Sequence, residues 1–243
     1  MAYLHIWPER ESAVIDLAEF IASLSAWDVH HRDRFTVALT GGSTARLLYQ
    51  ILAAPPYLDQ ISWDKWHVFW TDDACVSPGD AATNLKLATE SLLQFVPIPA
   101  RNIHPIDGEV DPDSSAEQYA ETISSVLESS QPSLDLVLLE VEPDGSTASL
   151  NSDSEHTTES EGLVTSNTDG DTPRVTFTLP LINSARTVSF LASGSSKANI
   201  LKEIIEPEGD PPTFPAAMVR AAADEAHWFV DREAAALIKS EGL

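Results

Sequence analysis

The chain has 243 residues, and 38 acidic side chains against 14 lysines and arginines give it a formal net charge of −24. This charge argues against nucleic-acid binding, which needs a basic surface, and against docking on an anionic membrane. Disorder is disfavoured because 43% of the residues are hydrophobic. With no signal peptide, no membrane-spanning apolar run and Cys75 as the only cysteine, we expect a soluble cytoplasmic protein without an internal disulfide.

Short apolar runs alternate with amphipathic segments along most of the chain. The expected strands cover residues 3–7, 35–40, 66–70, 134–139, 174–179 and 187–192. The expected helices follow Pro8 and Thr44, cover residues 84–95 and 116–127, and follow Ser195 and Asp231. Apolar strands separated by amphipathic helices are typical of a mostly parallel sheet with helices on both faces. We predict a single α/β domain over residues 1–243, doubly wound and Rossmann-like.

One segment breaks this alternation. Residues 151–173 are rich in Ser, Thr, Asp, Glu and Gly and almost free of large apolar side chains. This composition predicts a long, acidic surface loop within the domain.

Four polar turns follow predicted strands. In a parallel sheet, ligands bind beyond the carboxyl ends of the strands, so these turns are expected to meet at one edge. They lie at residues 40–44 (Thr-Gly-Gly-Ser-Thr), 71–73 (Thr-Asp-Asp), 143–150 (Pro-Asp-Gly-Ser-Thr-Ala-Ser-Leu) and 193–197 (Ser-Gly-Ser-Ser-Lys).

The first turn has the composition of an anion-binding loop. Gly41 and Gly42 let the backbone approach a ligand closely, and the following helix offers free N–H groups. The hydroxyls of Ser43 and Thr44 either donate to a ligand or cap that helix. An ordinary strand-to-helix turn explains the same residues equally well.

The other turns carry charged side chains. Asp72 and Asp73 are either an acid/base pair or two solvated carboxylates. Asp144 and Ser146 place small polar groups after the most apolar strand. Lys197, in the first turn of a helix, is unfavourable beside the helix dipole and therefore indicates a local anion, unless it is simply solvated.

Together these segments resemble one family. The matching residues are Leu39-Thr40-Gly41-Gly42-Ser43-Thr44, 66–73 with Thr83-Asn84, 96–99, Asn102-Ile103-His104-Pro105, 134–139 with Pro143-Asp144-Gly145, Thr147-Ala148-Ser149-Leu150, 174–180, Gly194 with Lys197, and Trp228-Phe229-Val230-Asp231. In this order they are similar to a 6-phosphogluconolactonase of the glucosamine-6-phosphate isomerase/6-phosphogluconolactonase superfamily. The resemblance covers nearly the whole chain.

The resemblance implies a hydrolase of the pentose phosphate pathway. Such enzymes open 6-phospho-D-glucono-1,5-lactone to 6-phosphogluconate without a metal or organic cofactor. By this resemblance, Thr40, Gly41, Gly42, Ser43, Thr44 and the basic Lys197 would hold the phosphate. The attacking water is activated by a histidine in the pattern Gly-x-Gly-x-Asp-Gly-His-Thr-Ala-Ser-Leu-Phe-Pro.

The chain departs from the family within this predicted pocket. Ser146 stands at the histidine position, and Glu140 and Glu142 stand at the two preceding glycines. Asn151-Ser152 replaces Phe-Pro, and Ala74 replaces the anion-binding arginine of a Gly-Asp-Glu-Arg turn. A serine hydroxyl is no base at pH 7, and a well-tuned general base contributes about 10²–10⁴ in rate.

Two kinds of residue are candidates to compensate. His156, in the acidic segment, either folds back toward Ser146 or is a solvated histidine. Arg174 either binds an anion or neutralises the acidic segment, and Arg186 is a weaker candidate of the same kind.

Three hypotheses follow. The first is a 6-phosphogluconolactonase with weakened or altered activity, in which Asp72 or Asp144 positions the water. The second is an inactive pseudoenzyme that binds a sugar phosphate or a protein partner. The third is an aldose–ketose isomerase or deaminase of amino-sugar phosphates with Asp72 as the base, and it ranks last because that branch also relies on the missing histidine.

Overall fold

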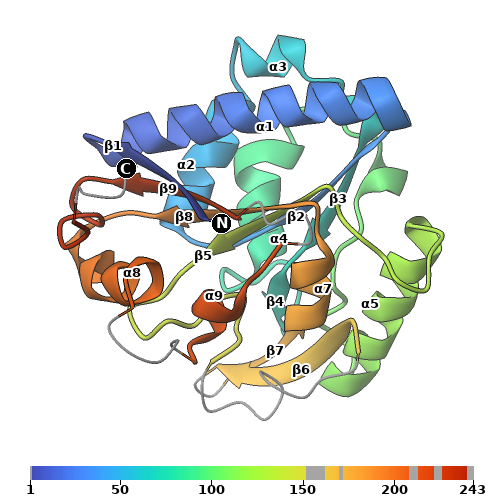
Figure 1. The fold of residues 1–243 in the computed structure, drawn as a ribbon. Helices are drawn as coiled ribbons and strands as arrows, with labels where there is room; N and C mark the ends of the chain where they lie inside the picture. The colour runs from blue at the N-terminus through green and yellow to red at the C-terminus, as the bar shows by residue number, and fades with distance from the viewer. Residues whose placement is uncertain (1, 152–161, 170–171, 208–212, 222–225, 240–243) are drawn as a thin grey trace.

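The computed structural model describes residues 2–151, 162–169, 172–207, 213–221 and 226–239, and it arranges the strands in two sheets (Figure 1). The larger sheet has six parallel strands in the order β1-β9-β8-β5-β2-β3. The smaller has three antiparallel strands in the order β4-β7-β6. The α/β fold with a mostly parallel sheet is thereby confirmed.

The strand bounds agree with most of the expected runs. The larger sheet comprises β1 (Ala2–Trp7), β2 (Phe35–Leu39), β3 (Trp66–Trp70), β5 (Leu136–Glu140), β8 (Thr187–Ala192) and β9 (Ala226–Asp231). The smaller comprises β4 (Asp72–Ala74), β6 (Val164–Asp169) and β7 (Thr172–Phe177).

Helices cover both faces of the larger sheet: α1 lies along one face, and α5, α7 and α8 lie on the opposite side (Figure 1). The α-helices are α1 (Arg10–Arg32), α2 (Ser43–Leu52), α3 (Tyr57–Gln60), α4 (Asn84–Ala88), α5 (Pro112–Val126), α7 (Leu179–Ser184), α8 (Ala198–Ile205) and α9 (Pro215–Met218). Short 3₁₀ turns lie at η1 (Trp63–Lys65), η3 (Ala100–Asn102) and η4 (Ser195–Lys197), and a π-helical turn, η2 (Thr89–Leu93), extends α4.

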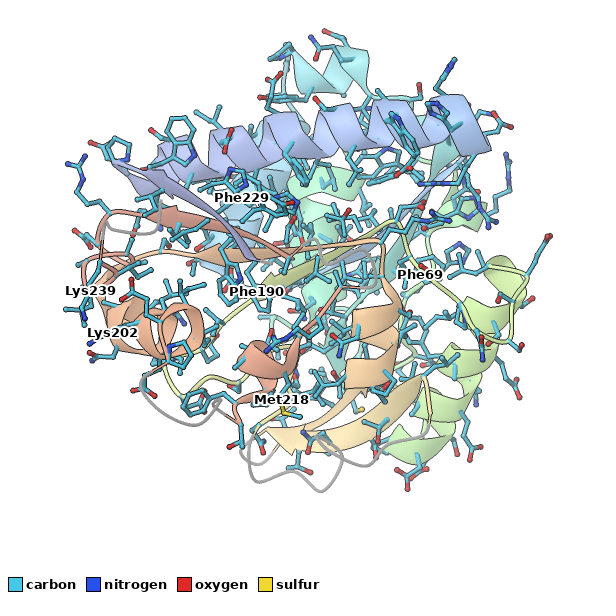
Figure 2. All side chains as sticks on the ribbon, viewed as in Figure 1. Phe69, Phe190, Lys202, Met218, Phe229 and Lys239 are labelled. Carbon is cyan, nitrogen blue, oxygen red and sulfur yellow. The ribbon has the colours of Figure 1, made fainter. Side chains whose placement is uncertain are left out.

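Apolar strand residues form the core between these layers. Phe69, Phe190 and Phe229, which Figure 2 labels on their strands, are fully buried. The ring of Phe190 stacks on that of Trp228 with centroids 3.9 Å apart. Burying a side chain of this size contributes about 1.5–3 kcal/mol, so these continuous apolar runs hold the sheet between its helices.

The prediction of an acidic surface loop over residues 151–173 is wrong in part. Within residues 151–173, the segment Val164–Asp169 forms β6, which pairs antiparallel with β7. Val164, Thr165 and Thr168 are β-branched and suit a strand even though few large apolar residues are present. Residues 152–161 and 170–171 lie outside the described part of the chain.

The structure differs from three further expectations. The strand expected at 174–179 is β7, which belongs to the smaller antiparallel sheet and not to the parallel one. Strand β9 was not predicted, because its apolar run, Trp228 to Val230, is short. No helix follows Asp231 in the described residues: the segment folds as turns, and the Asp231 carboxylate accepts a hydrogen bond from the Ala234 N–H at 2.8 Å.

All six strands of the larger sheet run in the same direction, so their carboxyl ends lie along one edge. Thr40 follows β2, Thr71 follows β3, Glu140 ends β5, Ser193 follows β8 and Asp231 ends β9. The predicted polar turns are therefore brought to the same side of the molecule.

Candidate active site

Two adjoining cavities lie at this edge. The first has a volume of about 650 Å³ and the second about 710 Å³. Gly42, Glu140 and Glu142 line both, so these residues form the wall that the two cavities share.

The residues singled out from the sequence are divided between the two cavities. Those lining the first are Thr40, Gly41, Gly42, Asp72, Asp144, Ser146 and Arg174. Those lining the second are Gly42 again, with Ser43, Thr44 and Lys197. Arg186 lies elsewhere, with its Nε 3.4 Å from an Asp135 carboxylate oxygen.

The loop after β2 brings the backbone close to its neighbours. Gly42 is the N-cap of α2 and has a φ of 98°, a conformation that favours glycine. A Cβ on Gly41 would lie 2.1 Å from the Asn84 side-chain oxygen. No side chain caps α2 at this residue, and Thr44 Oγ1 instead lies 3.2 Å from Ser193 Oγ. The N-cap residue of α2 therefore supplies no side-chain acceptor to the N–H groups of the first turn.

Asp72 is bound on both carboxylate oxygens. Arg174 donates to Asp72 Oδ2 from Nη2 at 2.6 Å and from Nε at 3.1 Å, and the Ser149 hydroxyl donates to the same oxygen at 2.6 Å. Thr71 Oγ1 donates to Asp72 Oδ1 at 3.2 Å. The carboxylate therefore fixes the guanidinium at the wall of the first cavity.

Arg174 on β7 faces Ala74 on the neighbouring strand β4. In the antiparallel pair of β4 and β7, Ala74 is directly opposite Arg174. Directly opposed residues of an antiparallel pair have their side chains on the same face. A guanidinium group therefore lies across the ladder from Ala74, and its ion pair is with Asp72.

Asp73 does not share this environment. It is buried, and its carboxylate accepts backbone hydrogen bonds from Ala74, Asn84 and Leu85 at 2.7–2.9 Å. Burial raises the pKa of Asp73 to about 6, although these three N–H groups oppose the shift. The sequence predicted a turn here, but Asp73 lies in β4, and its hydrogen bonds join that strand to the start of α4, which is a structural role.

Ser146 is tied to its neighbour Asp144. Its hydroxyl donates to Asp144 Oδ1 at 2.7 Å, and its backbone N–H donates to the same oxygen at 2.9 Å. These two hydrogen bonds hold the pKa of Asp144 below its usual value. At neutral pH the pair therefore presents an ionised carboxylate to the first cavity.

Glu140 lines both cavities but was not predicted as a site residue. The feature of the sequence that pointed to it is its place at a glycine position of the family pattern. Its Oε1 accepts a hydrogen bond from the Ala45 N–H at 3.2 Å. Burial raises the pKa of Glu140 to about 7, the Ala45 N–H opposes this, and the charge of Glu142 adds to it. Glu142 itself pairs with Lys197, whose Nζ lies 2.7 Å from Glu142 Oε2.

Histidines contribute nothing to the described lining of either cavity. His67 and His104 lie elsewhere, with Nδ1 and Nε2 3.3 Å apart beside Arg101 in a third cavity. Burial, followed by the charge of His67, lowers the pKa of His104 to about 4. His156 lies outside the described residues.

The described residues contain no group of three or more His, Cys, Asp or Glu side chains placed to hold a metal ion. No helix among them is both long enough and apolar enough to cross a bilayer.

The chain is similar to known proteins along most of its length. A family model for glucosamine-6-phosphate isomerases/6-phosphogluconolactonase matches residues 8–228. The chain is 36% identical over 243 residues to 6-phosphogluconolactonase 3, chloroplastic, of Arabidopsis thaliana, covering 95% of this chain and 74% of that one. It is 38% identical over 211 residues to the 6-phosphogluconolactonase of Synechocystis sp., covering 85% of each. The solved 6-phosphogluconolactonase of Thermotoga maritima superposes with a TM-score of 0.83 at 28% identity, covering 95% of this chain and 100% of that one.

Proposed function

The chain belongs to the glucosamine-6-phosphate isomerase/6-phosphogluconolactonase family, and from this premise we propose that it hydrolyses 6-phospho-D-glucono-1,5-lactone to 6-phosphogluconate, a step of the pentose phosphate pathway. The observation that carries the proposal is the gathering of the family's strand-end turns around two adjoining cavities. Relatives named as 6-phosphogluconolactonases match along nearly the whole chain.

In this proposal the phosphate lies at the second cavity. Its oxygens would accept hydrogen bonds from the Gly42-Ser43-Thr44 backbone at the amino end of α2, which favours anions. Lys197 lines the same cavity and would supply the positive charge. The lactone ring would then extend past Gly42 into the first cavity, where Thr40, Gly41 and Arg174 line the wall.

The chemistry in the first cavity is ester hydrolysis. A water oxygen bonds to the lactone carbonyl carbon, the bond from that carbon to the ring oxygen breaks, and the water's proton goes to the ring oxygen. We propose Asp144 as the acceptor that orients this water, with Ser146 holding its carboxylate. Asp72 is better suited to position Arg174, because both of its oxygens already accept hydrogen bonds.

We propose that the chain hydrolyses the lactone slowly. General-base catalysis is most effective when the pKa of the base is near the working pH. The pKa of Asp144 is lowered instead, so the aspartate is a weaker base than the imidazole of the family pattern. We therefore propose weakened catalysis on a substrate that also hydrolyses spontaneously.

An inactive sugar-phosphate-binding protein is the second candidate. It is favoured by one observation, the absence of a histidine among the described residues that line the first cavity. In that case the chain would be expected to act by binding a protein partner and not by catalysis.

The test is an acid-release assay on freshly prepared 6-phosphogluconolactone. The lactonase proposal expects proton release above the spontaneous rate, in proportion to protein concentration. A rate equal to that of buffer contradicts it. Calorimetric binding of 6-phosphogluconate without such a rate would favour the second candidate.

We propose the cytoplasm as the place of action. The chain's described residues contain no helix suited to crossing a bilayer. The Arabidopsis relative is named as chloroplastic, so an organelle is the alternative that the test must distinguish. A tagged full-length chain examined by cell fractionation tests this assignment, and recovery in an organelle fraction would contradict it.

A further inference from the structure

The side chain of Glu140 lies against the loop at which the phosphate is proposed to bind. Glu140 Oε1 accepts the Ala45 N–H, and a Cβ on Gly42 would lie only 2.3 Å from Glu140 Oε2. The carboxylate is thus an anion of the protein itself, held at the amino end of α2. Dipole and backbone donors favour an anion at that position, whatever molecule supplies it.

The cation of the same cavity also has a carboxylate partner. Lys197 is paired with Glu142, and 15% of the Lys197 side chain is exposed against 56% for Glu142. Glu140 and Glu142 stand at the two positions where the family pattern has glycine. Each of the two groups proposed to bind phosphate therefore faces a glutamate that the family pattern lacks.

The surroundings of Glu140 disfavour its ionised form. Burial is the largest cause, and the pKa of Glu140 rises to about 7. The charged groups that line the second cavity around it are Glu142 and Lys197, with Glu9, Arg10, Glu11, Asp231 and Glu233 at the ends of α1 and β9. Those that line the first cavity are Asp72, Asp144 and Arg174.

We propose that Glu140 is a specificity-determining residue at the phosphate end of the site: its ionised carboxylate competes with the substrate's phosphate for the amino end of α2, so phosphate binds together with uptake of a proton by Glu140. This inference rests on the proposed function, which supplies the phosphate position. Two negative groups on the same donors repel each other, whereas a protonated carboxyl does not.

The direction of the pH effect follows from this linkage. Above pH 7 Glu140 is increasingly ionised, so each bound phosphate must be accompanied by close to one proton and affinity falls by up to tenfold per pH unit. The phosphate monoester itself loses its second proton near pH 6. Between pH 7 and pH 9 the phosphate group of the ligand is therefore mainly a dianion, its carboxylate is ionised throughout, and the ligand's own titration does not produce the trend.

The test is calorimetry with 6-phosphogluconate between pH 7 and pH 9, in buffers of different ionisation enthalpy that count protons. We expect the wild-type affinity to fall tenfold or more over this range, with proton uptake approaching one. Glu140→Gln keeps the side-chain volume and the acceptor for Ala45, so it is expected to bind at least tenfold more tightly at pH 9, without this uptake. Gluconate, which lacks the phosphate, is expected to bind the wild type without the linked proton.

Glu233→Gln is the matched control, because it removes one negative charge from the lining of the same cavity. It is expected to retain the wild-type pH dependence, and an equal effect of both variants would overturn the assignment to Glu140. Thermal melting checks folding, and Glu140→Gly, the residue of the family pattern, is the second variant if Glu140→Gln does not fold.

An unchanged proton count in both Glu140 variants contradicts the inference, even if the lactonase assay is positive. A proton-linked phosphate site without lactone hydrolysis contradicts the proposed reaction and leaves the role of Glu140 supported. Absence of binding by every variant at every pH contradicts the phosphate position and the inference together.

Discussion

Strand β4, which follows β3, and the end of β5 each carry a buried carboxylate, but the two carboxylates differ in how many hydrogen-bond donors they meet. After β3, Asp73 accepts three backbone N–H groups, and Asp72 pairs with Arg174. At the end of β5, Glu140 accepts the Ala45 N–H, and the charge of Glu142 lies nearby. Burial raises the pKa of both Asp73 and Glu140, so the number of donors distinguishes them.

This difference separates an acid that joins two segments of the fold from an acid that lines the two cavities. A buried carboxylate with enough donors joins the segments that supply them. One with few donors and a nearby like charge retains a free energy penalty that a ligand or a proton can relieve. The following substitutions test that distinction, from the largest expected effect to the smallest.

Ser146→His tests whether the residue at position 146 alone limits the rate of lactone hydrolysis. An imidazole beside the ionised Asp144 would be a base with a pKa at or above its ordinary value near 6.5, so kcat/KM for the lactone is expected to rise about 100-fold. The rate should increase as pH rises through this range, because only the neutral imidazole accepts a proton. Steady-state kinetics at several pH values measure both effects.

Ser146→Asn is the control for side-chain size without a base. A similar gain in this variant would refute the catalytic explanation. Exchange of the cross-strand pair, Ala74→Arg with Arg174→Ala, is a useful background because it moves the arginine to the position of the family pattern and keeps one guanidinium group on this pair.

Asp73→Ala tests the structural half of the comparison. It leaves the backbone N–H groups of Ala74, Asn84 and Leu85 without their acceptor, which is expected to lower the free energy of unfolding by about 3 kcal/mol. Urea denaturation measures this change. The exposed Asp59 is the control position, and Asp59→Ala should change stability by less than about 0.5 kcal/mol; equal losses would show that Asp73 has no special role.

Lys197→Ala tests the phosphate end next to β5. Loss of this cation is expected to weaken binding of 6-phosphogluconate about tenfold, a change of about 1.4 kcal/mol. Calorimetry measures the affinity. Lys239→Ala removes an exposed lysine at the outer side of the molecule near α8 (Figure 2) and serves as the control; unchanged affinity on losing Lys197 would remove it from the site.

Glu140→Gln has the smallest expected effect and the opposite sign from Asp73→Ala. The folded-state pKa of Glu140 lies above its unfolded value, near 7 against 4.5, so the folded protein binds more protons and loses stability as pH rises between these values. The variant lacks this loss and is expected to be more stable by about 1 kcal/mol at pH 5.2, and nearly equal to the wild type at pH 4. Denaturation at both pH values checks this, and destabilisation at pH 5.2 would show instead that the charged carboxylate is a stabilising cap of α2.

Much of the fold was predictable because it depends on local patterns. The runs at β2, β3, β5 and β8 are apolar enough to be recognised as buried strands. β6 was missed because an antiparallel strand at the side of a small sheet needs few large apolar residues. The short apolar run of β9 was missed although it pairs with both β1 and β8.

The candidate site was predictable as a location but not as a set of contacts. Parallel strands bring their carboxyl ends together, so the turns after β2, β3, β5 and β8 were expected at one edge. Nothing in the neighbouring sequence of Asp72 and Asp73 indicates that one holds Arg174 while the other joins its own strand to α4. Successive residues of a strand point to opposite faces, and only the packing decides what each face meets.

The sequence by itself determined the α/β class, the order of the strand-end turns and the family, since these follow from periodicity and short motifs. The tertiary structure alone decided which charges meet. Ala45 donates to Glu140 across 95 positions of the chain, and Arg174 pairs with Asp72 across 102. Burial and donor number at such contacts determine whether a carboxylate stabilises the fold or competes with a ligand, and neither is a property of the residue's neighbours in sequence.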